Sequence, residues 1–97
     1  MKIEILDLRL IDKDQPLKAF VDVKLDHITI REFRVIKENG KRLRVATPQI
    51  SWKDTDGKIK YKTVITLPDE LKGELDRVIL NHFAEEMEKN NGQRTQR

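Results

Sequence analysis

The stretch Phe33–Pro48, FRVIKENGKRLRVATP, decides the fold of this 97-residue chain. Two short runs rich in aliphatic residues flank Asn39-Gly40, a dipeptide that favours hairpin turns whose central residues have positive φ. Pro48 cannot donate to a strand ladder, so the second run ends there. The pattern predicts two antiparallel strands, at residues 28–36 and about 42–47, joined by a turn.

The residues before this hairpin predict two further strands. Apolar side chains occupy every second position of residues 17–25, LKAFVDVKL, which is the period of a strand with one buried face. Residues 3–11 alternate in the same way. Residues 28–36 carry apolar side chains at both parities, Ile28 and Ile30 at one and Phe33 at the other. Strands buried on both faces show this pattern, so we expect a cover on each face of that strand.

The residues after Pro48 predict a loop, a strand and a helix. Residues 49–57 are expected to form a loop that Asp56-Gly57 closes, and a fifth strand follows at residues 58–63. A helix is expected from Pro68-Asp69-Glu70 to about Lys89, because proline suits the first turn and acids suit the positive end of the helix dipole.

Together these elements predict an α+β fold, with an antiparallel sheet of about five strands followed by a long C-terminal helix. The length favours a single domain, placed at residues 1–89, with a flexible polar tail at residues 90–97. Leu80, Phe83 and Met87 lie to one side of the main apolar stripe of the helix. We expect them at a homodimer interface; the alternative is that a long loop covers Phe83 and Met87.

The composition argues against several classes of protein. There is no cysteine, and His27 and His82 are the only histidines, so we expect no disulfide, no metal site and no cofactor. Ser51 lacks the motif of a nucleophile, and no glycine-rich phosphate loop is present. We therefore expect no enzyme and no small-molecule substrate. No apolar run approaches the length of a membrane span, which favours a cytoplasmic protein.

Positive charge is concentrated in the middle of the chain. Residues 31–62 contain ten Lys/Arg and four Asp/Glu, whereas residues 69–89 contain three basic and seven acidic residues. The middle third is thus the candidate surface for an anionic partner, DNA or RNA, and the helix is a poor one. Two other interpretations remain open. The lysines could protect a solvated sheet from edge-to-edge aggregation, or they could serve a protein adaptor that binds an acidic partner.

The candidate binding residues fall on two of the predicted strands and the loop between them. On the strand at 42–47, Arg42 and Arg44 face away from Leu43 and Val45. If that strand neighbours the one at 58–63, its arginines would join the lysines there in one patch. Trp52 is expected to stack on an unpaired base, or alternatively to close the edge of the core. The predicted phosphate contacts are Arg42, Arg44, Lys53, Lys58, Lys60 and Lys62.

The order of these segments resembles the SpoVG family, the bacterial stage V sporulation protein G or septation-regulator family. Residues 33–36 are similar to its "IRVI" element, residues 45–48 to its "VAMP" element, and residues 78–83 to its "AVLNEY" segment. The likeness covers about residues 1–84. It implies a small α+β domain that forms homodimers, binds nucleic acid and regulates gene expression, in some members during sporulation or septation. The family's basic pair after "MP" is absent here.

Overall fold

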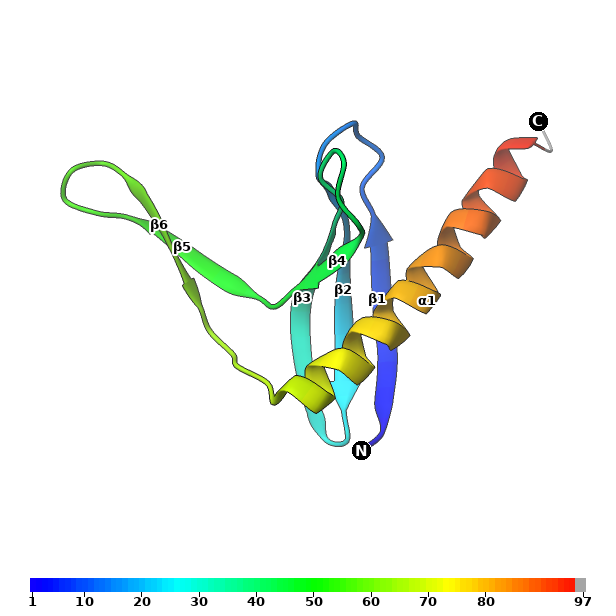
Figure 1. Ribbon diagram of the computed structural model, residues 1–97, viewed down its shortest axis with the longest axis horizontal. Helices are drawn as coiled ribbons and strands as arrows, with labels where there is room; N and C mark the ends of the chain where they lie inside the picture. The colour runs from blue at the N-terminus through cyan, green and yellow to red at the C-terminus, as the bar shows by residue number, and fades with distance from the viewer. Residues whose placement is uncertain (96–97) are drawn as a thin grey trace.

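The computed structural model describes residues 1–95, with side chains described as far as Asn90, and it has the predicted α+β fold (Figure 1). The strands are β1 (Ile3–Leu10), β2 (Leu17–Leu25), β3 (Ile28–Ile36), β4 (Arg44–Ala46), β5 (Gln49–Lys53) and β6 (Ile59–Thr63), and the helix is α1 (Asp69–Thr95). Strands β1 to β4 form one antiparallel sheet in that order, and β5 pairs with β6 in a second. Across residues 1–95, no helix combines the length and the apolar character that crossing a bilayer requires.

The bounds of the first three strands agree with the prediction almost to the residue. The alternation expected for residues 3–11 is interrupted, because a β-bulge between Ile5 and Asp7 leaves Leu6 exposed while Ile5 and Leu8 pack against the core. One face of β2 carries Ala19, Val21, Val23 and Leu25, all buried. The expectation of a cover on both faces of β3 holds only at its end, where the adjacent residues Val35 and Ile36 are both buried. It is wrong for Ile30 and Phe33, because a β-bulge resets the alternation between them. Val23 lies opposite Ile30 and Val21 opposite Phe33, so β3 inserts one extra residue between them. Glu32, at the bulge, has φ 66°. The bulge turns Ile30 and Phe33 to the same face.

Helix α1 covers that face. Its buried residues Leu75, Ile79 and Phe83 are spaced four apart and join the apolar side chains of the sheet in one core. A row with this spacing drifts around the helix, because four residues turn more than a full 360°. The helix crosses the sheet obliquely (Figure 1), and the drift keeps the row on the sheet. The position of Phe83 to one side of the main apolar stripe therefore follows from packing within one chain.

The start of β4 and the end of the helix differ from the prediction. Gly40 has the positive φ that its turn requires, 75°, and the Lys41 N–H donates to the Glu38 carbonyl at 3.0 Å. The connection is longer than a two-residue turn, so β4 begins at Arg44 and not at residue 42. The helix continues to Thr95, past the expected stop at residues 90–92. Residues 96–97 of the expected tail lie outside the described residues.

The face of the sheet away from the helix carries one buried carboxylate, that of Asp22, which is 4% exposed. It accepts hydrogen bonds from the guanidinium of Arg9 at 3.1 Å, from Arg31 at 3.2 Å and from the Glu32 N–H at 3.0 Å. Arg9 lowers the pKa of this carboxyl, the Glu32 N–H lowers it further, and burial opposes both. This cluster ties β1, β2 and the β3 bulge together.

Candidate functional site

Residues 49–63, which we call the arm, form a two-stranded hairpin and not the loop expected at residues 49–57. Two apolar residues of β5, Ile50 and Trp52, alternate with polar ones, as in a strand. At the tip, Asp54 Oδ1 accepts from the N–H groups of Asp56 and Lys58, both at 2.9 Å. Gly57 completes the turn with φ 81°.

The arm projects away from the main sheet and helix (Figure 1). Every residue of β5 and β6 is exposed. Trp52 is 46% exposed and is not part of the core cluster, so it does not close the edge of the core. At the base of the arm, Arg34 of β3 donates to the Gln49 side-chain oxygen at 3.0 Å. The arm is therefore a separate surface attached to the sheet at one end.

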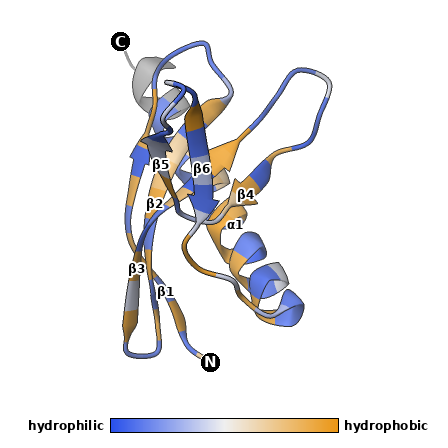
Figure 2. Cartoon of the chain, turned by 90° about the vertical axis from the view of Figure 1, so that its left-hand side faces the viewer, coloured by the Kyte–Doolittle hydropathy of each residue, from blue (hydrophilic) through white to orange (hydrophobic). Residues whose placement is uncertain are grey.

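The pairing of β5 with β6 decides which side chains share a face. Trp52 lies opposite Lys60, and Ile50 lies opposite Lys62. Directly opposite residues in an antiparallel pair project to the same side, with Cβ atoms about 5 Å apart. Ile50, Trp52, Lys60 and Lys62 thus form one face, which we call the Trp–Lys face. Figure 2 shows the hydrophilic stretches of β6 in blue.

The opposite face of the arm has a different composition. Ser51 lies opposite Tyr61, and Lys53 lies opposite Ile59. Lys53 is thereby separated from the predicted lysines of the Trp–Lys face. Tyr61, which is 65% exposed, gives this side an aromatic ring that sequence reasoning missed. The sequence did contain a signal for this. Tyr61 lies between Lys60 and Lys62, and successive residues of a strand project to opposite faces, so the tyrosine must lie on the face opposite the two lysines.

Most of the lysines on the arm form no ion pair with an acidic side chain. Lys60 Nζ lies 3.9 Å from Asp54 Oδ2, a long contact to a carboxylate that already accepts two turn hydrogen bonds. Among the residues whose side chains are described, Lys53, Lys58 and Lys62 form no ion pair. With four lysines and two aspartates, residues 49–63 carry a net charge of +2. The arm is a cationic surface whose charges are available to a ligand.

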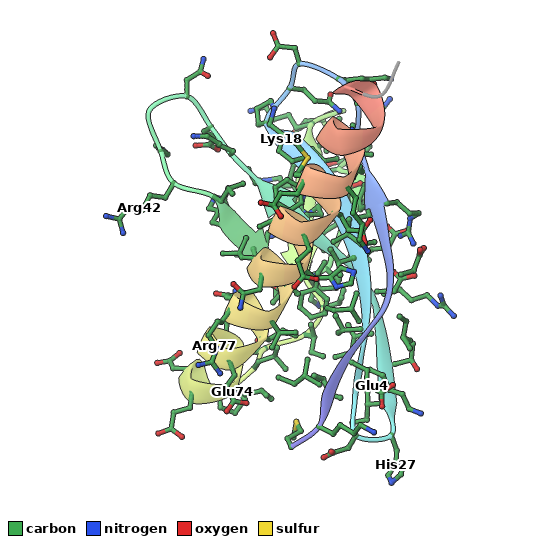
Figure 3. The ribbon with its side chains drawn as sticks, turned by 90° about the vertical axis from the view of Figure 1, so that its right-hand side faces the viewer. Glu4, Lys18, His27, Arg42, Glu74 and Arg77 are labelled. Carbon is green, nitrogen blue, oxygen red and sulfur yellow. The ribbon has the colours of Figure 1, made fainter. Side chains whose placement is uncertain are left out.

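The two arginines predicted for the same patch lie outside the arm, Arg44 in β4 of the main sheet and Arg42 just before that strand. β4 pairs with β3 and β6 pairs with β5, so the two basic strands are not neighbours. Arg44 Nη2 lies 3.6 Å from Glu38 Oε1. The hydrogen bond from Lys41 to Glu38, and then the charge of Arg44, lower the pKa of that carboxyl. Arg42 precedes β4 and projects into solvent from the connection (Figure 3).

The residues predicted for a homodimer interface have unequal exposure. Phe83 is 7% exposed and lies in the core of its own chain, and Leu80 packs against that core. Met87 is more exposed. Met87 and Phe83 line a groove together with Leu43 and with residues 10–13 at the end of β1 and in the β1–β2 connection. Two connections therefore border these side chains, and the interface stays a prediction.

In the part of the chain that the structure describes, no three His, Asp or Glu side chains lie close enough to hold a metal ion. His82 Nε2 lies 3.7 Å from Glu86 Oε1 on the same helix. Comparisons with models of protein families and with curated proteins find no match for this chain. The geometry of the arm is thus the main basis for a functional proposal.

Proposed function

We propose that this chain is a non-enzymatic nucleic-acid-binding regulatory protein, similar to the SpoVG family, and that it binds its ligand through the arm. Lys60 and Lys62 contact phosphates, Lys58 at the tip supports them, and Trp52 stacks on a base. The protein acts in the cytoplasm, and it acts as a homodimer, which is what the resemblance implies. The observation that carries the proposal is the register that puts an exposed tryptophan opposite one lysine and diagonal to another.

Surfaces that bind single-stranded nucleic acid combine cations along a groove or strand with aromatic rings for the bases. Lys60 and Lys62 are two residues apart on one strand, so their Cα atoms are about 6–7 Å apart along the arm. Both project next to Trp52, and no other element of residues 1–95 covers this face. A flexible strand can therefore place a base on the ring while its phosphates meet the lysines.

The charges elsewhere in the molecule favour the arm over the helix. Residues 69–89 carry a net charge of −4, from three basic and seven acidic residues. Such a helix repels phosphate, and the arm projects away from it (Figure 1). Arg42 and Arg44, and Lys53 on the other side of the arm, remain secondary candidates for phosphate contacts at the edges of the ligand.

The proposal is tested by titrating labelled single-stranded DNA, single-stranded RNA and duplex DNA with the wild type and with Lys60→Gln/Lys62→Gln. The control is Lys13→Gln/Lys89→Gln, which removes two exposed lysines outside the arm and changes the net charge equally. We expect binding to a single strand that weakens about tenfold or more in the arm variant and little in the control, since each phosphate contact supports affinity. Equal weakening in both variants would show a non-specific charge effect and refute the site.

The exposed apolar residues of the arm, Ile50 and Ile59, favour one alternative, a protein adaptor that binds an acidic partner. The same variants distinguish it. A partner captured from a lysate through Lys60 and Lys62, and retained after nuclease treatment, together with no affinity for any of the three oligonucleotides, would favour the adaptor.

A further inference from the structure

The outer edge of β5 has no strand beside it. Two hydrogen bonds of the arm show which main-chain N–H and C=O groups of β5 point toward this edge. The Asp54 N–H donates to the Lys58 carbonyl at 2.9 Å, and the Val64 N–H donates to the Pro48 carbonyl at 3.4 Å. Hydrogen-bonded pairs recur at every second residue of an antiparallel ladder. Ile50 and Trp52 therefore direct their main-chain groups toward β6, and Gln49, Ser51 and Lys53 direct theirs outward.

This outer edge is complementary to a second copy of itself. If two β5 strands run antiparallel around a two-fold axis at Ser51, each Ser51 faces the other, and Gln49 faces Lys53 of the second copy. These three pairs are the outward-directed ones, so about six main-chain hydrogen bonds form. Ile50 then lies opposite Trp52 of the second copy, in the closer, non-hydrogen-bonded kind of pair. No like charges face each other.

The outer edge of β6 does not have this property. Its outward-directed residues are centred on Tyr61, so the equivalent pairing would place Lys60 opposite Lys62 of the second copy, twice. Like charges directly opposite each other destabilise a strand pair. The sequence of β6 therefore protects one edge of the arm, while the central residues of β5, Ile50 to Trp52, carry no charge.

We propose that two copies of this chain pair through β5, with the two-fold axis at Ser51, to form a four-stranded sheet in the order β6–β5–β5–β6. A two-stranded hairpin with no core is marginal in water, and sheets of three or more strands with an apolar face are more stable. Pairing supplies such a face, because it gathers Ile50 and Trp52 of both copies.

The pairing also completes the binding surface, a consequence that rests on the proposed function. On the shared face, the tryptophans and isoleucines lie in the middle, and the lysines of each β6 lie on either side. With strands about 4.8 Å apart, the two rows of lysines are separated by about 14 Å. One copy alone offers a single row of lysines beside a single tryptophan, so the second copy adds the other row and the second tryptophan to the shared face.

Sedimentation of the full chain, without nucleic acid, tests the pairing. Ser51→Pro removes the N–H at the two-fold axis without removing a hydrogen bond inside the arm, and Tyr61→Pro is the matched change on the other edge. We expect Ser51→Pro to raise the dimer dissociation constant at least about tenfold, since each copy loses a central hydrogen bond, and Tyr61→Pro to leave it unchanged. Equal dimerisation of the wild type and both variants would overturn the proposal.

A second pair of variants covers the case in which proline disturbs the arm itself. The chain has no cysteine, so Ser51→Cys and Tyr61→Cys each introduce a single thiol. Facing residues of a hydrogen-bonded pair have Cα atoms about 5.5 Å apart, within the range of disulfides. Under mild oxidation Ser51→Cys should form covalent dimers at least ten times faster than Tyr61→Cys, and equal rates would overturn the pairing. Dimers that form as expected but bind no oligonucleotide would refute the proposed function alone.

Discussion

Replacing Trp52 and Phe33 by alanine in separate variants should separate binding from folding. Phe33 is fully buried in the core, so Phe33→Ala should cost about 3–5 kcal/mol of the free energy of unfolding. Trp52 is half exposed on an arm with no buried residue, so Trp52→Ala should cost about 0.5 kcal/mol or less. Base stacking contributes about 1–3 kcal/mol, so the same variant should bind single strands roughly 5- to 150-fold more weakly.

Two assays are needed for this comparison. Urea unfolding followed by far-ultraviolet circular dichroism measures the free energy of unfolding, and anisotropy of a labelled oligonucleotide measures affinity. The reasoning would be refuted if Trp52→Ala lost more than about 2 kcal/mol of stability, because losses of that size are typical of core residues. It would also be refuted if the variant bound a single strand as tightly as the wild type.

Three further predictions concern the sheet and the helix. Asp22→Asn should lower the free energy of unfolding by about 2 kcal/mol at pH 7, because Arg9 and the Glu32 N–H lose a charged acceptor; chemical denaturation measures this. The folded-state pKa of Asp22 is lowered, so its contribution is present above about pH 4 and is lost as the pH falls through the folded-state pKa. As the pH is lowered, the free energy of unfolding of the wild type should therefore fall more steeply than that of Asp22→Asn. Identical pH dependence of the two would count against the ion cluster. Gly40→Ala should cost about 1 kcal/mol in the same assay, since the added Cβ meets nothing within 4 Å and only the positive φ opposes it; a stabilised variant would contradict that turn geometry. Lys72→Ala should cost about 1 kcal/mol, because Lys72 Nζ donates to the Val45 carbonyl at 3.0 Å and ties β4 to the helix, and loss of amide-exchange protection at β4 would identify the cause.

The strands β1, β2 and β3 could be located from the sequence because one face of each packs against the core. Burial imposes an apolar residue at every second position of β2, and the alternation marks its bounds. The bulge in β3 could not be found in this way. Its inserted residue makes Ile30 and Phe33 differ in parity although both face the helix. From the sequence alone, a bulged strand with apolar residues at both odd and even positions cannot be distinguished from a strand that is buried on both faces.

The arm was only half predictable for the opposite reason. Neither of its strands is buried, so no core imposes a pattern on residues 49–53, and polar residues there looked like a loop. The lysines of β6 were identified, but their partners depend on register, which the sequence does not determine. Pairing with β5 moved Lys53 to the other face and separated Arg44 from the lysines. The helix ran past Asn90 because asparagine and glycine weaken a helix without ending it.

Fluorescence of Trp52 is the most direct test of the central claim, that the arm is the nucleic-acid-binding surface. Trp52 is the only tryptophan in the chain, so its emission reports from the arm alone. Titration with a single-stranded oligonucleotide should quench it saturably, and added salt should shift the midpoint to higher oligonucleotide concentration, because phosphate contacts release counterions. Binding detected by anisotropy of the labelled oligonucleotide with no change in Trp52 emission would contradict the claim, as would the absence of any binding at low salt.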